Sequence, residues 1–203
     1  HCVIALDTRG HGKSPRGDKP FTIRQFAEDL HDFMDEQEIE KADILGFSDG
    51  GNIALVFALK YPGRVDRLIL NGANLYGRGV KPSIQIPIII GYHAACLFAG
   101  KSEAARKNAE MLGLMVNDPN LTPEELSENR DPDFLRIPKL VIAGNRDMIK
   151  DEHTRLIYAS LPNAQIRVMK GSHFIAKENP EEFNRIVEEF LRSSERQQDP
   201  DQM

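Results

Sequence analysis

The sequence contains few cysteines and no excess of basic residues. Its two cysteines, Cys2 and Cys96, are far apart and have neither CxxC nor Cys/His metal spacing, so we expect no disulfide framework and no zinc site. Lysine and arginine total 26 against 31 aspartate and glutamate residues, which gives a formal net charge of −5. Because no basic stripe or Lys/Arg block is present, nucleic acid and anionic membrane surfaces are not expected as partners.

The sequence also lacks a hydrophobic run long enough to form a transmembrane helix. Residues 84–99 are strongly apolar, but they include Pro87 and are fewer than the roughly 20 residues that cross a bilayer. We expect this stretch to be buried or to line a pocket. Without a recognisable signal peptide the default location is the cytoplasm. The chain begins with His1, not methionine, and reads as a strand from Cys2, so we expect that an upstream segment has been removed.

Five short apolar runs predict β-strands, at residues 2–6, 42–45, 65–70, 139–143 and 165–169. The first four are almost continuously apolar, which is typical of parallel strands covered on both faces. Helical patterns separate most of these runs. Thr22 and Gln25 form a capping box before one apolar stripe, and Asn179 with Pro180 opens another. The alternation predicts an α/β fold with a mostly parallel sheet and flanking helices.

The alternation stops between Leu75 and Asp131. This segment contains the apolar stretch, a predicted helix over residues 102–115 and a short helix that begins at Thr122 and Pro123. A helical insertion after a strand lies above the carboxyl edge of such a sheet, where ligands bind, so we interpret it as a lid; an ordinary packing subdomain would give the same pattern. The predicted division is a core of residues 1–74 and 132–193, a lid of residues 75–131 and a disordered tail of residues 194–203.

The most informative motif is GFSDGG at residues 46–51, which lies between a predicted strand and an apolar helical segment. It matches G-x-S-x-G at a strand-to-helix turn, the nucleophile elbow. Such a turn strains its central residue and pushes that side chain outward. Glycines on both sides avoid a collision between a Cβ atom and the neighbouring strand or helix. Ser48 is therefore the candidate nucleophile.

A serine nucleophile needs a histidine base and a carboxylate that orients the base. His173 directly follows the last predicted strand, and Asp147 follows the fourth, in the required chain order of serine, acid and histidine. Asp151 is the main rival acid, although helix capping is its better alternative role. Asp133 precedes the strand and is a poorer candidate. We interpret His11, in a turn after the first predicted strand, as a loop-packing residue.

On these residues, the chain resembles the α/β-hydrolase superfamily. DTRGHGKS at residues 7–14 resembles the loop after the family's fourth strand, residues 46–50 its elbow, Asp147 its acid and GSH at residues 171–173 its histidine loop. FSDGG at residues 47–51, with GANL at residues 72–75, is most similar to the small esterase branch that includes valacyclovir hydrolase-like enzymes. Some members use an aspartate nucleophile, but here Ser48 holds the central position.

The resemblance implies a serine hydrolase that cleaves a small carboxylic ester, or an amide, thioester or lactone, through an acyl-enzyme. Ser48 attacks, His173 shuttles the proton, Asp147 orients His173, and the backbone N–H of Asp49 stabilises the oxyanion. No metal and no organic cofactor is expected. Two alternatives stay open: a catalytically impaired or non-catalytic binding module of the same fold, and cofactor-free perhydrolysis on the same three residues.

Five residues are expected to contact the substrate. The Asp49 carboxylate either forms a local hydrogen bond or faces the pocket, where it would favour cationic substrates such as amino-acid esters. Phe47 lies beside the nucleophile. Ile88, Tyr92 and Phe98, in the predicted lid, are expected to shape an apolar acyl pocket.

The resemblance also implies about three N-terminal strands that this chain does not show, so the expected fold is an N-terminally truncated α/β-hydrolase fold. The second oxyanion donor normally comes from the loop after the third of these strands. A strand lost between residues 2–6 and 42–45 would leave strand edges unpaired. We therefore expect either a fragment of a longer protein or two strands that have closed the gap. Without a replacement donor the rate would fall roughly 10²–10³-fold.

Overall fold

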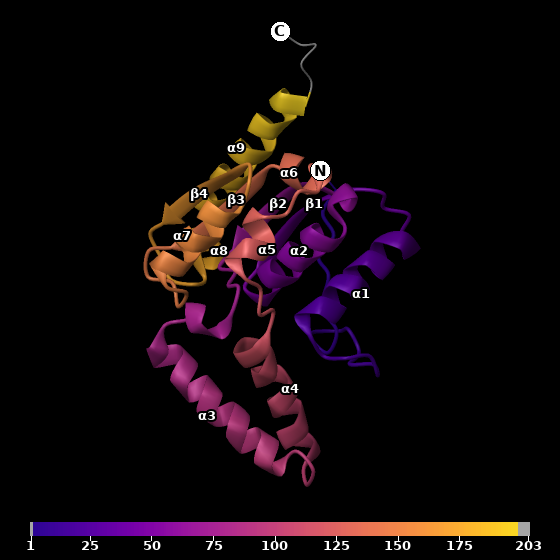
Figure 1. Ribbon diagram of the computed structural model, residues 1–203, viewed down its shortest axis with the longest axis vertical. Helices are drawn as coiled ribbons and strands as arrows, with labels where there is room; N and C mark the ends of the chain where they lie inside the picture. The colour runs from indigo at the N-terminus through magenta and orange to yellow at the C-terminus, as the bar shows by residue number, and fades with distance from the viewer. Residues whose placement is uncertain (1, 199–203) are drawn as a thin grey trace.

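A four-stranded parallel sheet forms the centre of the protein, as the sequence predicts (Figure 1). The computed structural model describes residues 2–198. The strands are β1 (Ala42–Phe47), β2 (Val65–Asn71), β3 (Lys139–Gly144) and β4 (Ala164–Met169), in the spatial order β1-β2-β3-β4. Because every pairing is parallel, all carboxyl ends lie at one edge of the sheet.

The helices follow the predicted pattern closely. They are α1 (Ile23–Glu36), α2 (Asp49–Lys60), α3 (Pro82–Phe98), α4 (Glu103–Asn117), α5 (Pro123–Ser127), α6 (Pro132–Arg136), α7 (Asp151–Ser160), α8 (Ile175–Glu178) and α9 (Pro180–Gln198). The short 3-10 turns are η1 (Pro62–Arg64) and η2 (Gly77–Gly79). Thr22 accepts a hydrogen bond from Gln25 N–H at the start of α1, and Thr122 forms a complete capping box with Glu125.

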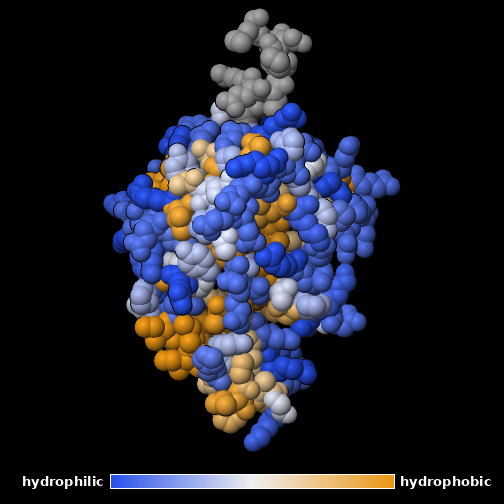
Figure 2. Space-filling model, viewed as in Figure 1, coloured by the Kyte–Doolittle hydropathy of each residue, from blue (hydrophilic) through white to orange (hydrophobic). Residues whose placement is uncertain are grey.

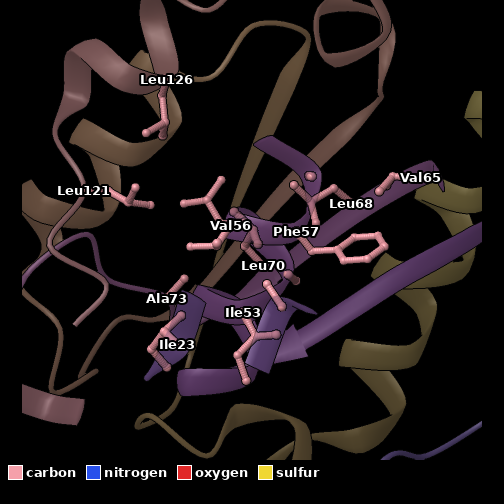
Figure 3. Packing of buried hydrophobic residues seen from close by; sticks show 14 of the residues in the cluster. Ile23, Ile53, Val56, Phe57, Val65, Leu68, Leu70, Ala73, Leu121 and Leu126 are labelled. Carbon is pink, nitrogen blue, oxygen red and sulfur yellow. The ribbon is translucent and has the colours of Figure 1, made fainter. Parts of the chain in front are cut away.

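Two apolar clusters cover the two faces of the sheet. Leu68 and Leu70 of β2 point into a cluster with α1 and α2 (Figure 3). Ile69, between them, points to the opposite cluster with α8 and α9. This alternation follows from the two-residue period of a strand. Both faces of β2 and β3 are therefore buried, which explains their continuous apolar runs, whereas Leu45 of β1 and Val168 of β4 are 47 and 44 % exposed.

Residues 2–6, predicted as the first strand, do not form a strand. No backbone hydrogen bond joins them to β1 in the described part of the chain, and Val3 is 85 % exposed. A cavity of about 910 Å³, lined by Ile4 on one side and Ile44 on the other, separates this segment from β1. The two segments have not closed the gap between them. A strand forms only where a neighbour completes its ladder of hydrogen bonds, and an apolar pattern cannot supply that neighbour.

The apolar stretch of residues 84–99 lies in α3, and most of it is exposed. Ile86, Ile90 and Leu97 are 55, 64 and 78 % exposed, whereas Gln85 is the buried residue of this helix. Figure 1 shows α3 and α4 projecting together from the sheet, and Figure 2 shows the resulting apolar patch. The expectation of burial is wrong because burial requires a second surface, and α3 packs chiefly along α4.

The second half of the predicted lid packs into the body of the protein. Leu121 and Leu126 are buried in the same cluster as α2 and β2 (Figure 3). The hairpin of α3 and α4 is thus the part that projects, and the lid boundaries at residues 75 and 131 stay a prediction. At the other end, α9 extends to Gln198, so residues 194–198 of the predicted tail are helical. The remaining tail residues, 199–203, lie outside the described part of the chain.

A lysine is buried at the start of β3. Lys139 has no exposed surface, and its Nζ donates to the carbonyl oxygens of Phe134 at 2.5 Å and Ile137 at 2.9 Å. Nζ also lies 4.4 Å from the centre of the Phe134 ring. Burial lowers the pKa of Lys139 to about 8 from its ordinary value of 10.5.

This burial predicts a stability that rises with pH. Between about pH 8 and 10.5 the unfolded chain binds a proton at Lys139 that the folded chain has released, so the free energy of unfolding increases through this window. We expect the stability of the wild type relative to Lys139→Met to grow between pH 7.5 and pH 10, as measured by urea unfolding. A difference that stays constant or shrinks would contradict the prediction. Groups common to both proteins cancel in this comparison.

Candidate active site

Ser48 lies in a strained turn between β1 and α2. Its backbone has φ 53° and ψ −120°, a region that residues other than glycine rarely adopt. Its N–H donates to the carbonyl oxygen of Asn71 at the end of β2, at 2.8 Å. The turn is therefore anchored to the adjacent strand, and the predicted strain at the centre of the elbow is present.

The two outer glycines of the elbow motif have different surroundings. A Cβ atom on Gly46 would lie 2.1 Å from the backbone oxygen of Gly50, which a fixed backbone cannot accommodate. A Cβ on Gly50 itself would meet nothing within 4 Å. The sequence-based expectation that both glycines avoid a collision is correct for Gly46 and wrong for Gly50, because Gly50 already lies in α2 and its missing side chain would point into open space.

The structure brings Ser48, His173 and Asp147 together at the carboxyl edge of the sheet. Ser48 Oγ lies 3.0 Å from His173 Nε2, and His173 Nδ1 lies 2.8 Å from Asp147 Oδ1. A carboxylate can only accept, so Nδ1 carries the proton toward Asp147. Nε2 then has a lone pair facing the serine hydroxyl. This is the relation between nucleophile, base and orienting acid that serine chemistry requires.

His173 and Asp147 are held in place by buried contacts. Asp147 is 3 % and His173 5 % exposed. Asp147 Oδ1 also accepts the N–H of Ile149 at 2.9 Å, whereas its Oδ2 is buried without a hydrogen-bond partner in the described chain. The ring of Phe47 lies against His173, with 4.9 Å between ring centres. Gly72 packs beneath the imidazole, and a Cβ there would come within 2.7 Å of His173 Cε1.

The amino end of α2 points toward Ser48. Asp49 is the first residue of this helix, and the first N–H groups of a helix have no partner within it. The helix dipole places partial positive charge at the same end. The Asp49 N–H is thus available to a developing negative charge beside Ser48, in keeping with its predicted role.

Asp49 follows the nucleophile in the chain and lines the same cavity as Ser48. Burial raises the pKa of the Asp49 carboxyl, an effect that the charges of His11 and His173 oppose. Asp49 and His11 both line the cavity. Burial also raises the pKa of Asp118, at the end of α4, and the negative charge of Asp49 adds to that rise. The two acids therefore interact with each other, although Asp118 does not line the cavity in the described chain.

Some predicted substrate contacts line the cavity and others do not. Phe47 and Asp49 do, whereas Ile88, Tyr92 and Phe98 are absent from its lining. Phe98 is mostly exposed near the far end of α3. A role for these three residues as substrate contacts stays a prediction.

The lid residue that does line the cavity is Leu114, from α4, and α1 and α2 contribute Phe26 and Ile53. Their spacing marks them only as apolar positions of helices, so the sequence carries no signal that singles them out. His11 also lines the cavity instead of serving only to pack its loop; its Nδ1 contacts Arg9 O at 3.1 Å.

The rival acids Asp151 and Asp133, and the buried histidine His153, occupy structural positions. Asp151 is exposed in the first turn of α7, where it pairs with Arg155 at 2.8 Å. Asp133 lies in the first turn of α6. His153 is buried, accepts the N–H of Leu75 at 3.0 Å, and has its pKa lowered to about 4 by burial. None of these three residues lines the cavity in the described chain.

Residues 2–198 contain no cluster of three or more His, Cys, Asp or Glu side chains placed to hold a metal ion. In the same residues, no helix is both long enough and apolar enough to span a bilayer.

The sheet, the elbow and the three convergent side chains are arranged as in an α/β hydrolase, and the comparisons with known proteins support an assignment to the α/β-hydrolase superfamily. A family model described as the alpha/beta hydrolase fold matches residues 1–87. The chain is 28 % identical to the 2-hydroxymuconate semialdehyde hydrolase of Pseudomonas putida, over 95 % of this chain and 78 % of that protein. It is 27 % identical to the serine hydrolase BPHL of Homo sapiens, over 94 % and 69 %.

Solved structures agree with this assignment. A hydrolase from Pseudomonas aeruginosa superimposes with a TM-score of 0.61 at 28 % identity, covering 91 % of this chain and 77 % of that chain. Together these relatives support hydrolase activity for the protein in general.

Proposed function

We propose that the protein is a serine hydrolase that cleaves small carboxylic esters through an acyl-enzyme. The observation that carries this proposal is the chain of short contacts from Ser48 Oγ through His173 to Asp147. Amides, thioesters and lactones share the acyl-transfer chemistry and are secondary candidates.

The reaction has two halves. Ser48 Oγ attacks the carbonyl carbon while its proton passes to His173 Nε2, and the Asp49 N–H stabilises the negative oxygen that forms. The intermediate collapses, and the alcohol leaves with the proton from His173. Water then attacks the acyl group and gives its proton to His173. Ser48 recovers that proton as the carboxylic acid is released.

Hydrolysis of p-nitrophenyl esters and covalent labelling by a fluorophosphonate test this proposal. Both reactions are expected with the wild type and neither with Ser48→Ala. A folded wild type that neither labels nor hydrolyses any of a panel of short-chain esters would favour the non-catalytic binding module instead.

The position of Asp49 supports a preference for cationic esters. Asp49 lines the cavity together with Ser48. Across about 4 Å, an opposite charge contributes roughly 1–4 kcal/mol at the effective dielectric constants of water and a protein surface. An amino-acid ester carries its ammonium group next to the reacting carbonyl, at about this distance from the nucleophile.

Asp49→Asn is therefore expected to lower kcat/KM for an alanine ester about tenfold or more. The kcat/KM for the matching propionate ester, which has no ammonium group, is expected to change little. The substitution keeps the backbone N–H and removes the charge, so the oxyanion contact is unaffected. The ratio of the two kcat/KM values is the measurement. Equal losses on both esters would show that the carboxylate does not select for charge.

A further inference from the structure

The loop that carries Asp147 is paired with the segment that leads into the α3–α4 hairpin. Residues 79–81 run antiparallel to residues 148–150. The pairing consists of a bridge between Val80 and Ile149, a bond from Lys81 N–H to Met148 O at 2.8 Å, and a bond from Lys150 N–H to Gly79 O at 2.9 Å. Because α3 begins at Pro82, the chain passes from this pairing directly into the projecting hairpin.

The side chain of Lys81 makes a second connection to the same loop. Its Nζ donates a hydrogen bond to the main-chain carbonyl oxygen of Asp147. A charged donor forms a stronger hydrogen bond than a neutral one. On its other side, the Asp147 N–H donates to Gly144 O at 3.1 Å. The Asp147 peptide groups are thus held from both directions, one of them by a residue at the base of the hairpin.

The orientation of the Asp147 carboxylate depends on few contacts. Oδ1 accepts from His173 and from the N–H of Ile149, and Oδ2 has no partner in the described chain. If the Asp147 backbone rotated, its carboxylate would swing away from His173, and the imidazole would lose the bond that fixes its tautomer. Loss of that bond is costly in serine enzymes, since the wrong tautomer cannot accept the serine proton.

We propose that Lys81 is a positioning residue, which holds the backbone of Asp147 so that the Asp147 carboxylate orients His173. Lys81 thereby connects the base of the α3–α4 hairpin to the reacting groups. This inference rests on the proposed function. Lys81 is not part of the cavity lining, so it acts through Asp147 and not on the substrate. A role of this kind affects the chemical step and leaves substrate binding unchanged.

The test compares Lys81→Met, Lys81→Arg and Lys150→Met with the wild type in hydrolysis of a p-nitrophenyl ester. Lys81→Met keeps the aliphatic stem and removes the donor, and its kcat is expected to fall on the order of tenfold with KM unchanged. Lys81→Arg keeps a charged donor and is expected to recover most of the loss. Lys150→Met removes a lysine from the same paired segment that has no side-chain contact with Asp147 in the described chain, and kcat is expected to stay within twofold.

Activity is expressed per folded molecule, with folding checked by thermal unfolding. If Lys81→Met does not fold, Lys81→Gln replaces it, with the same expected loss. A folded, uncharged variant with kcat within twofold of the wild type would overturn the inference, as would an equal loss in Lys150→Met or a loss confined to KM. Inactivity of the wild type itself, by turnover and by fluorophosphonate labelling, would instead count against the proposed function.

Discussion

Replacing Ser48 with alanine is expected to abolish fluorophosphonate labelling and to lower kcat for ester hydrolysis about 10³-fold or more. The hydroxyl oxygen lies 3.0 Å from His173 Nε2, and no acyl-enzyme can form without it. Ser14→Ala is the matched control. Ser14 also lines the cavity, but its hydroxyl donates to the backbone oxygen of Asp7. This control is expected to keep both labelling and turnover.

The same prediction extends to a double variant. His173→Ala removes the base that activates Ser48, so it is expected to lower kcat by a factor similar to that for Ser48→Ala. The two changes disable one unit, and the double variant is expected to be no slower than the slower single variant. Steady-state rates of the four proteins form the cycle. Losses that multiply would mean that the two side chains act independently and would exclude the proposed mechanism.

Gly46→Ala is expected to destabilise the protein by about 3 kcal/mol or more and to remove fluorophosphonate labelling. Its new Cβ would lie 2.1 Å from the carbonyl oxygen of Gly50 and 2.6 Å from the nitrogen of Gly51. Both are backbone atoms of α2, so the helix or the strand must move. Overpacking of a well-packed site typically costs about 1–3 kcal/mol and sometimes more, and here the displaced atoms also position Ser48.

Gly50→Ala is the matched control within the same motif. Its Cβ would meet no atom within 4 Å, and alanine in a helix is more stable than glycine by about 0.5–1 kcal/mol. Gly50→Ala is therefore expected to be as stable as the wild type or slightly more stable. Urea unfolding of the two variants decides the comparison. Equal destabilisation by both substitutions would show that the collision at Gly46 is not the cause.

Local sequence patterns predicted the helix caps, the strands and the turn whose signals lie in residues close together in the sequence. The N-caps Thr22 and Thr122 begin α1 and α5 as expected, because a cap joins residues three positions apart. The predicted box at Thr22 is only half formed, since the Gln25 side chain donates to Asp29 instead. The four apolar runs that became β1 to β4 were predicted to within two residues of their ends. Both faces of β2 and β3 are buried, whereas β1 and β4 each keep one face largely exposed. The turn at Ser48 was predicted from its glycines and adopts the expected strain.

Patterns that depend on a distant partner were less reliable. Residues 2–6 have the composition of a strand but no neighbour beside them, and α3 has the composition of a buried helix but projects from the sheet. The expected contacts of Ile88, Tyr92 and Phe98 depended on where that helix lies. The contact of Lys81 with Asp147 joins residues 66 positions apart. The sequence around either residue does not predict this contact.

The sequence by itself determined the three candidate catalytic residues: a serine at a strained turn, an acid and a histidine, each of which follows a different strand. Parallel strands expose their carboxyl ends at a common edge, so chain order was enough to predict that these groups would meet. Only the tertiary structure decided which apolar surfaces are covered, what lines the cavity and which lysine supports the acid. Those outcomes depend on how separate segments pack against one another, which no single segment encodes.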